Sequence, residues 1–121
     1  MSYDDELANR VREVFAEFCD RDDMPIRATS ITEKAMFGGL GFMVDGHMAV
    51  AVSREGGILG RCDPDDTKTI LTRKHSAPMV MRERDLAGWF RVDAEGIGTK
   101  RQLRGWMELC SRYVAQLPPK H

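Results

Sequence analysis

Cysteine and histidine are scarce in this 121-residue sequence, and their placement excludes the common metal and disulfide patterns. The three cysteines, Cys19, Cys62 and Cys110, are far apart and odd in number, and no two form a Cys-x-x-Cys pair. No histidine stands at metal-ligand spacing from any of them. We therefore expect three reduced thiols, as is usual for a cytoplasmic protein, and neither a metal nor a cofactor.

Long apolar runs and a strong net charge are also absent. No stretch approaches the roughly 20 apolar residues of a membrane-spanning helix, and the first residues, "MSYDDELANR", are too polar for a signal peptide. The net charge is −1, although residues 1–60 carry six basic and eleven acidic side chains and residues 61–121 carry twelve and eight. We expect a cytoplasmic protein that binds no membrane and does not bind nucleic acid directly.

Helical periodicity is present near both ends of the chain. Residues 4–18 place apolar side chains on one stripe, after an acidic first turn that favours the helix dipole. Thr99 is a candidate N-cap for a last helix, in which apolar residues recur at spacings of three and four. Asp63 predicts the start of a short helix, because proline follows it at the first helical position.

Between these helices, short apolar segments are interrupted by glycines, which is typical of antiparallel strands. Asp45-Gly46 predicts a type I′ hairpin turn. The sequence leaves open whether residues 33–37 and 40–44 form one strand or two. Further strands are expected at 47–53, at 57–62, and on both sides of a turn near Arg84-Asp85. The order α-β-β-β-α-β-β-α predicts an α+β two-layer sandwich, a single domain over residues 1–121 with helices on one face of the sheet.

The stretch "MFGGLGFMVDGHMAV", residues 36–50, is the strongest candidate for a functional surface. Its glycines precede a strand and not a helix, so a backbone bend is expected there instead of a phosphate-binding loop. Alternation places the even-numbered side chains of 47–52 on one face and the odd-numbered on the other, and both sets are apolar or small. An open sheet face should be polar. We therefore expect this face to be covered by a protein partner or, in a homodimer, by a second copy.

The chain also contains "EKAMFGGLGFMVDGHMAV", "GILGRCD", "PMVMRERDLAGWFRV" and "LRGWMELCSRYVAQLPPK". Together these segments resemble the TfoX N-terminal domain family, over residues 3–120. The resemblance implies an α+β fold similar to type III secretion chaperones. It also implies a regulatory role, because TfoX is a regulator of natural competence thought to work with a transcription activator. That regulator has a second, C-terminal domain, so this chain is expected to be a stand-alone copy of the first. The family provides no established catalytic residue. Gly60 stands where a larger apolar residue is expected, which predicts a looser strand.

The leading interpretation is a small cytoplasmic protein-interaction module with a regulatory role and no catalysis. One alternative is a small-ligand or anion-binding protein, or an enzyme, with a pocket near Met36–Gly39 and Arg61; a catalytic pair of Cys62 and His47 would belong to it. The other is a nucleic-acid accessory protein with a basic stripe of Arg82, Arg84, Arg91, Lys100, Arg101 and Arg104, in which Arg82 and Arg84 share a strand face. The candidate interaction surface comprises Met36, Phe37, Gly38, Gly39, Phe42, Met43, His47, Met48, Arg61, Met79, Arg82 and Trp89.

Overall fold

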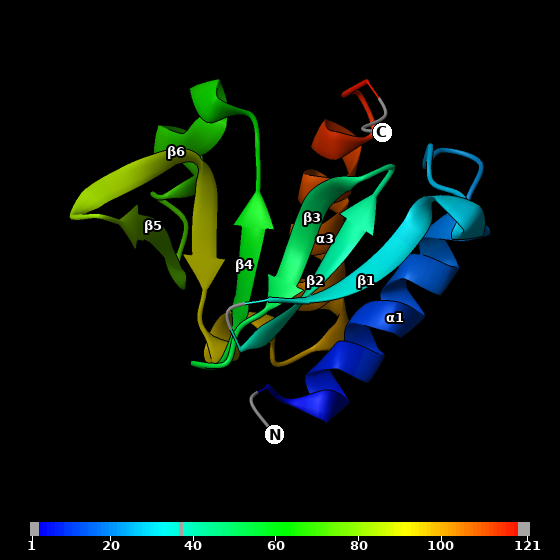
Figure 1. Cartoon of the computed structure of the whole chain (residues 1–121), viewed down its shortest axis with the longest axis horizontal. Coiled ribbons are helices and arrows are strands. Elements are labelled where there is room, and N and C mark those ends of the chain that lie inside the picture. Colours follow the sequence, from blue (N-terminus) through cyan, green and yellow to red (C-terminus); the bar gives the residue numbers. More distant parts are fainter. Residues whose placement is uncertain (1–2, 37, 119–121) are drawn as a thin grey trace.

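The computed structural model describes residues 3–36 and 38–118, which form an antiparallel sheet with two long helices on one face (Figure 1). The long helices are α1, Asp5–Cys19, and α3, Lys100–Val114. The described residues contain six strands: β1 Ile31–Met36, β2 Gly39–Val44, β3 His47–Val52, β4 Ile58–Arg61, β5 Ser76–Met81 and β6 Arg84–Val92. A short helix α2, Thr67–Ile70, lies between β4 and β5. The expected α+β class is confirmed.

The sheet has one strand more than the expected order α-β-β-β-α-β-β-α contains. Residues 31–36 and 39–44 are two strands that pair with each other, from Ile31 opposite Val44 to Met36 opposite Gly39. The connection is short, and Gly38 adopts a φ of 76° there, a left-handed conformation that glycine reaches without steric cost. The open choice between one strand and two is therefore settled in favour of two.

The strands lie in the order β1-β2-β3-β4-β6-β5, and every neighbouring pair is antiparallel. The β2–β3 turn is confirmed, with positive φ at both Asp45 and Gly46 (51° and 87°), as a type I′ turn requires. The β5–β6 turn was placed too late in the sequence. Met81 pairs with Arg84, so the turn consists of Arg82 and Glu83, with φ of 53° and 67°.

Both long helices begin at a side-chain cap. The carboxylate of Asp4 accepts hydrogen bonds from the backbone N–H groups of Glu6 and Leu7. Thr99 caps α3, and Gln102 returns a hydrogen bond to the Thr99 backbone, which completes a capping box. These caps satisfy donors that a helix leaves unpaired in its first turn. None of the helices in residues 3–36 and 38–118 is long and apolar enough to cross a bilayer.

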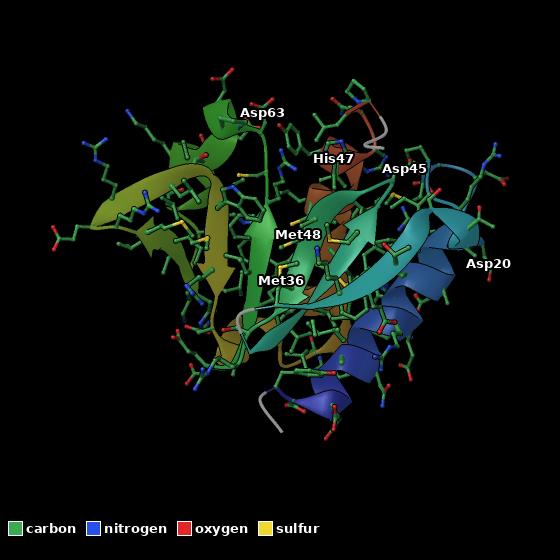
Figure 2. All side chains as sticks on the ribbon, in the orientation of Figure 1. Asp20, Met36, Asp45, His47, Met48 and Asp63 are labelled. Carbon is green, nitrogen blue, oxygen red and sulfur yellow. The ribbon has the colours of Figure 1, made fainter. Side chains whose placement is uncertain are left out.

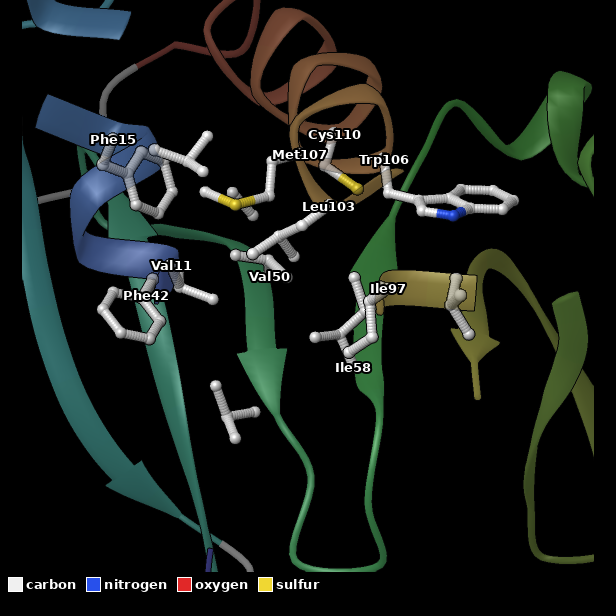
Figure 3. Packing of buried hydrophobic residues seen from close by; sticks show 14 of the residues in the cluster. Val11, Phe15, Phe42, Val50, Ile58, Ile97, Leu103, Trp106, Met107 and Cys110 are labelled. Atoms are coloured by element: carbon white, nitrogen blue, oxygen red, sulfur yellow. The ribbon is translucent and has the colours of Figure 1, made fainter. Parts of the chain in front are cut away.

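The core lies between the two long helices and the sheet face that they cover (Figure 3). The ring of Phe15 on α1 lies 5.8 Å from that of Phe42 on β2, and Phe90 on β6 lies 5.5 Å from Trp106 on α3. The helices also contribute apolar side chains at helical spacing, namely Leu7, Val11, Val14, Phe18, Leu103, Met107, Cys110 and Val114.

Gly60 gives β4 a close fit to this core, contrary to the expectation of a looser strand. A Cβ at Gly60 would lie 2.5 Å from Cζ of Phe90 and 2.8 Å from Sγ of Cys110. Phe90 of β6 and Cys110 of α3 occupy the space that a larger side chain at position 60 would need. They fill this part of the core in place of a side chain from β4.

Candidate functional site

The sheet face without helices carries an apolar groove of about 440 Å³. We call it the methionine groove, after the four methionines in its lining. Met36 and Met48 lie near each other over the central strands (Figure 2). The apolar side chains on which the argument below depends are Met36, Met48, Leu59, Met79, Met81 and Trp89.

The floor of the groove follows from strand alternation. Side chains two residues apart on a strand point to the same face. On β4, Ile58 is buried in the core, whereas Leu59 faces the groove. On β6, Phe90 enters the core, and Trp89 and Arg91 line the groove. Leu59 lies opposite Arg91 in the register between β4 and β6.

A β-bulge brings Met48 into the groove. Phe42 pairs with Val50 and Met43 with Met48, so Ala49 is an extra residue in β3. The expected alternation therefore fails at this point: Val50 remains in the core, but Met48 lies on the other face, with Ala51. Nothing in the sequence of residues 47–52 indicates the bulge.

The β5–β6 hairpin forms one wall of the groove. It contributes Met79, Val80 and Met81 from β5 and Leu86 from β6. Val80 is 55% exposed and Met81 46% exposed. Large apolar side chains with this much exposure in one hairpin are a feature of binding surfaces.

Charged side chains lie at the end of the groove near the β3–β4 turn. Arg91 contacts Glu55, with 3.7 Å between Nη1 and Oε2, and approaches Oγ of Ser53 at 3.4 Å. The side chain of Arg54 extends to Gly38, where a Cβ would lie 2.7 Å from the Arg54 Cδ. This end therefore holds two arginines and one glutamate.

Arg61 lies next to the groove, beyond Trp89. Its guanidinium carbon is 5.5 Å from the ring centre of Trp89 and 5.8 Å from that of Tyr113 on α3. Its Nη1 lies 3.5 Å from Nδ1 of His47, and Nε2 of His47 donates to the Pro118 carbonyl at 2.7 Å. Arg61 and His47 are thus close together, but neither is part of the groove lining.

The structure brings some of the candidate surface residues together and separates others. Met36, Gly39, Met48, Met79 and Trp89 line the groove. Gly38 adjoins the groove through Arg54, and Met43, opposite Met48, is half-buried outside the lining. Phe42 is buried against α1 and is no surface residue. Arg82 lies in the exposed hairpin turn, so it does not share a strand face with Arg84. Phe37 lies outside the described residues.

Sequence reasoning missed Arg54, Leu59 and Tyr113. Leu59 belongs to a four-residue strand with a glycine on one side, too short for a clear alternation. Arg54 lies in a turn, and its neighbour Gly38 is 16 positions away in the sequence. Tyr113 fits the apolar stripe of the last helix, so its spacing gives no sign of its contact with Arg61.

The Cys62–His47 pair that the enzyme alternative would use is not present among the contacts of either residue. The Cys62 thiol lies 3.8 Å from Oγ1 of Thr67 inside the core, and burial raises its pKa. Burial also raises the pKa of Cys110, to about 12. Both thiols are therefore held in the form that is a poor nucleophile. Within residues 3–36 and 38–118 no group of three His, Cys, Asp or Glu side chains could hold a metal ion.

The six basic residues of the proposed stripe do not lie on one surface. Arg91 faces the methionine groove. Lys100 and Arg104 on α3 both form ion pairs with Glu17 of α1, and their hydrogen bonds lower the pKa of that carboxyl group. They therefore lie on the helix side of the sheet, opposite Arg91. Arg82 and Arg84 are at the far end of the β5–β6 hairpin.

These features define a small α+β protein whose helices cover one sheet face and whose other face presents an apolar groove. The family model of the TfoX N-terminal domain matches residues 24–113 of the 121, and the chain belongs to that family. No curated protein and no solved structure matches the chain. The similarity to type III secretion chaperones stays a prediction.

Proposed function

We propose that this chain is a non-enzymatic protein-interaction module of the cytoplasm, in which the methionine groove binds an apolar segment of a protein partner. The observation that carries the proposal is the apolar groove on a sheet face that would be polar if water alone covered it. Methionine is unbranched and adaptable, and it is over-represented on surfaces that accept varied apolar segments. Membership of the TfoX N-terminal domain family supports a module similar to a competence regulator. We propose a component of transcription regulation as its partner.

The titratable groups of the groove support binding over catalysis. Two arginines and one glutamate line it, at one end. An arginine stays protonated throughout the physiological range and is therefore a poor general acid or base. Arg91 and Glu55 also pair with each other. The remaining lining is suited to burying apolar side chains.

A second copy of the chain is the other occupant that the sequence suggests, and charge argues against it. An isologous contact over this face would bring Arg54, Arg61 and Arg91 of both copies into one interface, with only Glu55 from each copy to balance them. We therefore propose a different protein as the occupant. Sedimentation should give a mass near the 13.7 kDa of one chain; a mass of twice that value, reduced to one chain by Leu59→Glu, would assign the groove to a homodimer.

Photo-crosslinking tests the groove directly. A benzoylphenylalanine at Val80, which is exposed in the groove wall, should crosslink a protein in the cells of origin that the same probe at the exposed Glu13 of α1 does not. That protein is then purified and its affinity measured. Leu59→Glu should weaken binding by roughly tenfold or more, since a carboxylate enters an apolar contact, whereas Thr69→Glu on α2 adds the same charge away from the groove. Equal affinities for a folded Leu59→Glu protein and the unchanged chain would refute the proposal.

The volume of the groove favours a small apolar ligand as a second candidate, because pockets of ~300–1,000 Å³ hold small molecules. Arg61 lies outside the lining, so the anion anchor expected for that alternative is not in the pocket itself. Native mass spectrometry of the protein from its own cells distinguishes the two candidates. A retained small molecule that Leu59→Glu abolishes supports the ligand.

A further inference from the structure

Arg61 contacts two aromatic rings and a histidine, and it has no carboxylate partner among the described residues. Its guanidinium carbon lies 5.5 Å from the ring centre of Trp89 and 5.8 Å from that of Tyr113. The lone pair of His47 Nδ1 faces its Nη1, because Nε2 of that ring donates to Pro118. Five of the twelve other arginines pair with acids among the described residues, namely Arg12, Arg21, Arg91, Arg104 and Arg112.

This arrangement prepares Arg61 to bind an anion. A guanidinium has five N–H donors, and the described contacts use one of them, at 3.5 Å. Trp89, Tyr113 and Arg61 are all half-buried, so the cation is partly shielded from water but remains accessible. Aromatic stacking restricts the side chain before any ligand arrives, so less conformational entropy is lost on binding. A carboxylate matches the two parallel donors of the fork.

The position of Arg61 ties this anion site to the methionine groove. Trp89 contributes to both, since its ring lines the groove and contacts the guanidinium. Leu59 and Arg61 are two residues apart on β4 and therefore face the same side of the sheet. At the other end of the groove are Arg54 and Arg91. A segment in the groove thus meets apolar side chains along its length, Arg54 and Arg91 at one end of the lining, and Arg61 next to the other end.

We propose that the groove recognises an acidic amphipathic segment of a protein, and that Arg61 binds a carboxylate of that segment. The inference rests on the proposed function and adds to it the chemistry of the partner. Charge complementarity carries it: the charged residues of the lining are two arginines and one glutamate, and Arg61 adds a third arginine next to the groove through its contact with Trp89. Arg61 gives the preference for an acidic residue in the bound segment, next to the residues that contact the apolar lining.

Selection of displayed random 12-residue peptides on the immobilised full chain tests this inference. We expect enriched peptides that combine several apolar residues with Asp or Glu. Binding of a synthesised enriched peptide should weaken by roughly tenfold or more on Arg61→Gln, as for loss of a hydrogen-bonded charge. Arg61→Lys keeps the charge but loses the planar fork, and it should recover only part of the affinity. Arg84→Gln, which removes a charge from the end of the hairpin, is the matched control. Thermal unfolding confirms that each variant is folded.

The outcomes separate the inference from the proposed function. Enriched peptides without acidic residues, which bind Arg61→Gln as well as the unchanged chain but fail on Leu59→Glu, would overturn the carboxylate site and leave the groove. Peptides unaffected by Leu59→Glu, or no enrichment at all, would overturn both. The inference is supported when replacing the acidic residue of the peptide by its amide lowers the binding affinity by the same factor as Arg61→Gln. The two changes together should then lower the affinity little more than either one alone.

Discussion

Replacing Gly39 by alanine should destabilise the fold by about 2–3 kcal/mol, the upper part of the range for overpacking a rigid site. A Cβ at this position would lie 2.4 Å from the backbone oxygen of Val52. For the distance between this Cβ and the Val52 oxygen to reach 3.0 Å, β2 and β3 must separate by about 0.6 Å where Leu40 pairs with Val52. No side-chain rotation relieves this contact, because the atom that obstructs it is a backbone carbonyl. For a chain of this length the melting temperature should fall by roughly 8–12 °C.

Thermal and urea unfolding followed by circular dichroism measure this change. Gly105→Ala is the matched control, because a Cβ there meets nothing within 4 Å and the residue is exposed on α3. Alanine in a helix interior should stabilise by about 0.5–1 kcal/mol. The two substitutions add the same methyl group and should move the urea midpoint in opposite directions. A Gly39→Ala protein as stable as the unchanged chain would show that β2 and β3 do not approach as closely as described.

The core and the surface ion pairs give three further predictions. Gly60→Ala should destabilise by about 1–2 kcal/mol, the lower part of the range for overpacking and less than Gly39→Ala, because the atoms in its way belong to the side chains of Phe90 and Cys110, which can shift. Hydrogen bonds from Arg21 lower the pKa of Asp23 to about 2, and Arg12 lowers the pKa of Glu33. Since these folded pKa values lie below the unfolded ones, the stability they add is present above about pH 4.5 and is lost as the pH falls toward about 2; the urea midpoint should follow this course, and more weakly in Asp23→Asn. An aromatic disulfide reagent should label Cys19 first. Cys62 and Cys110 should react only after unfolding, because both are 1% exposed or less. Rapid labelling of all three thiols in the native protein would contradict the buried positions of Cys62 and Cys110.

The fold could be predicted largely because its signals are local. Asp4 and Thr99 stand at helix starts, and Asp45-Gly46 can hardly form anything but a tight turn between two apolar runs. The β5–β6 turn was predicted two residues too late because it uses Arg82 and Glu83 at positive φ, where glycine or asparagine is expected. The β1–β2 connection was left open for a related reason. The pair Gly38-Gly39 is compatible both with a bend inside one strand and with a turn between two strands.

The candidate site was harder to predict because it depends on register between strands. The sequence indicated an apolar open face, and five of the candidate residues do line the methionine groove. It placed Phe42 on that surface, although the alternation of β2 sends Phe42 to the core with Leu40 and Val44. The bulge at Ala49 and the stacking of Arg61 against Tyr113 arise from contacts between distant segments. Contacts of this kind produce no periodic pattern in the sequence.

The β5–β6 hairpin stands at the margin of the sheet, and β5 is hydrogen-bonded to β6 alone. Its inner residues shape the groove, while the helices are anchored on the strands β2, β3 and β4 and on the buried half of β6. A change in the length or composition of this hairpin would therefore alter the binding surface that we propose, while the core contacts of β2, β3 and β4 stay the same. Related proteins could therefore differ in the segment they bind through substitutions in about ten consecutive residues of the hairpin, while the residues of the core stay unchanged.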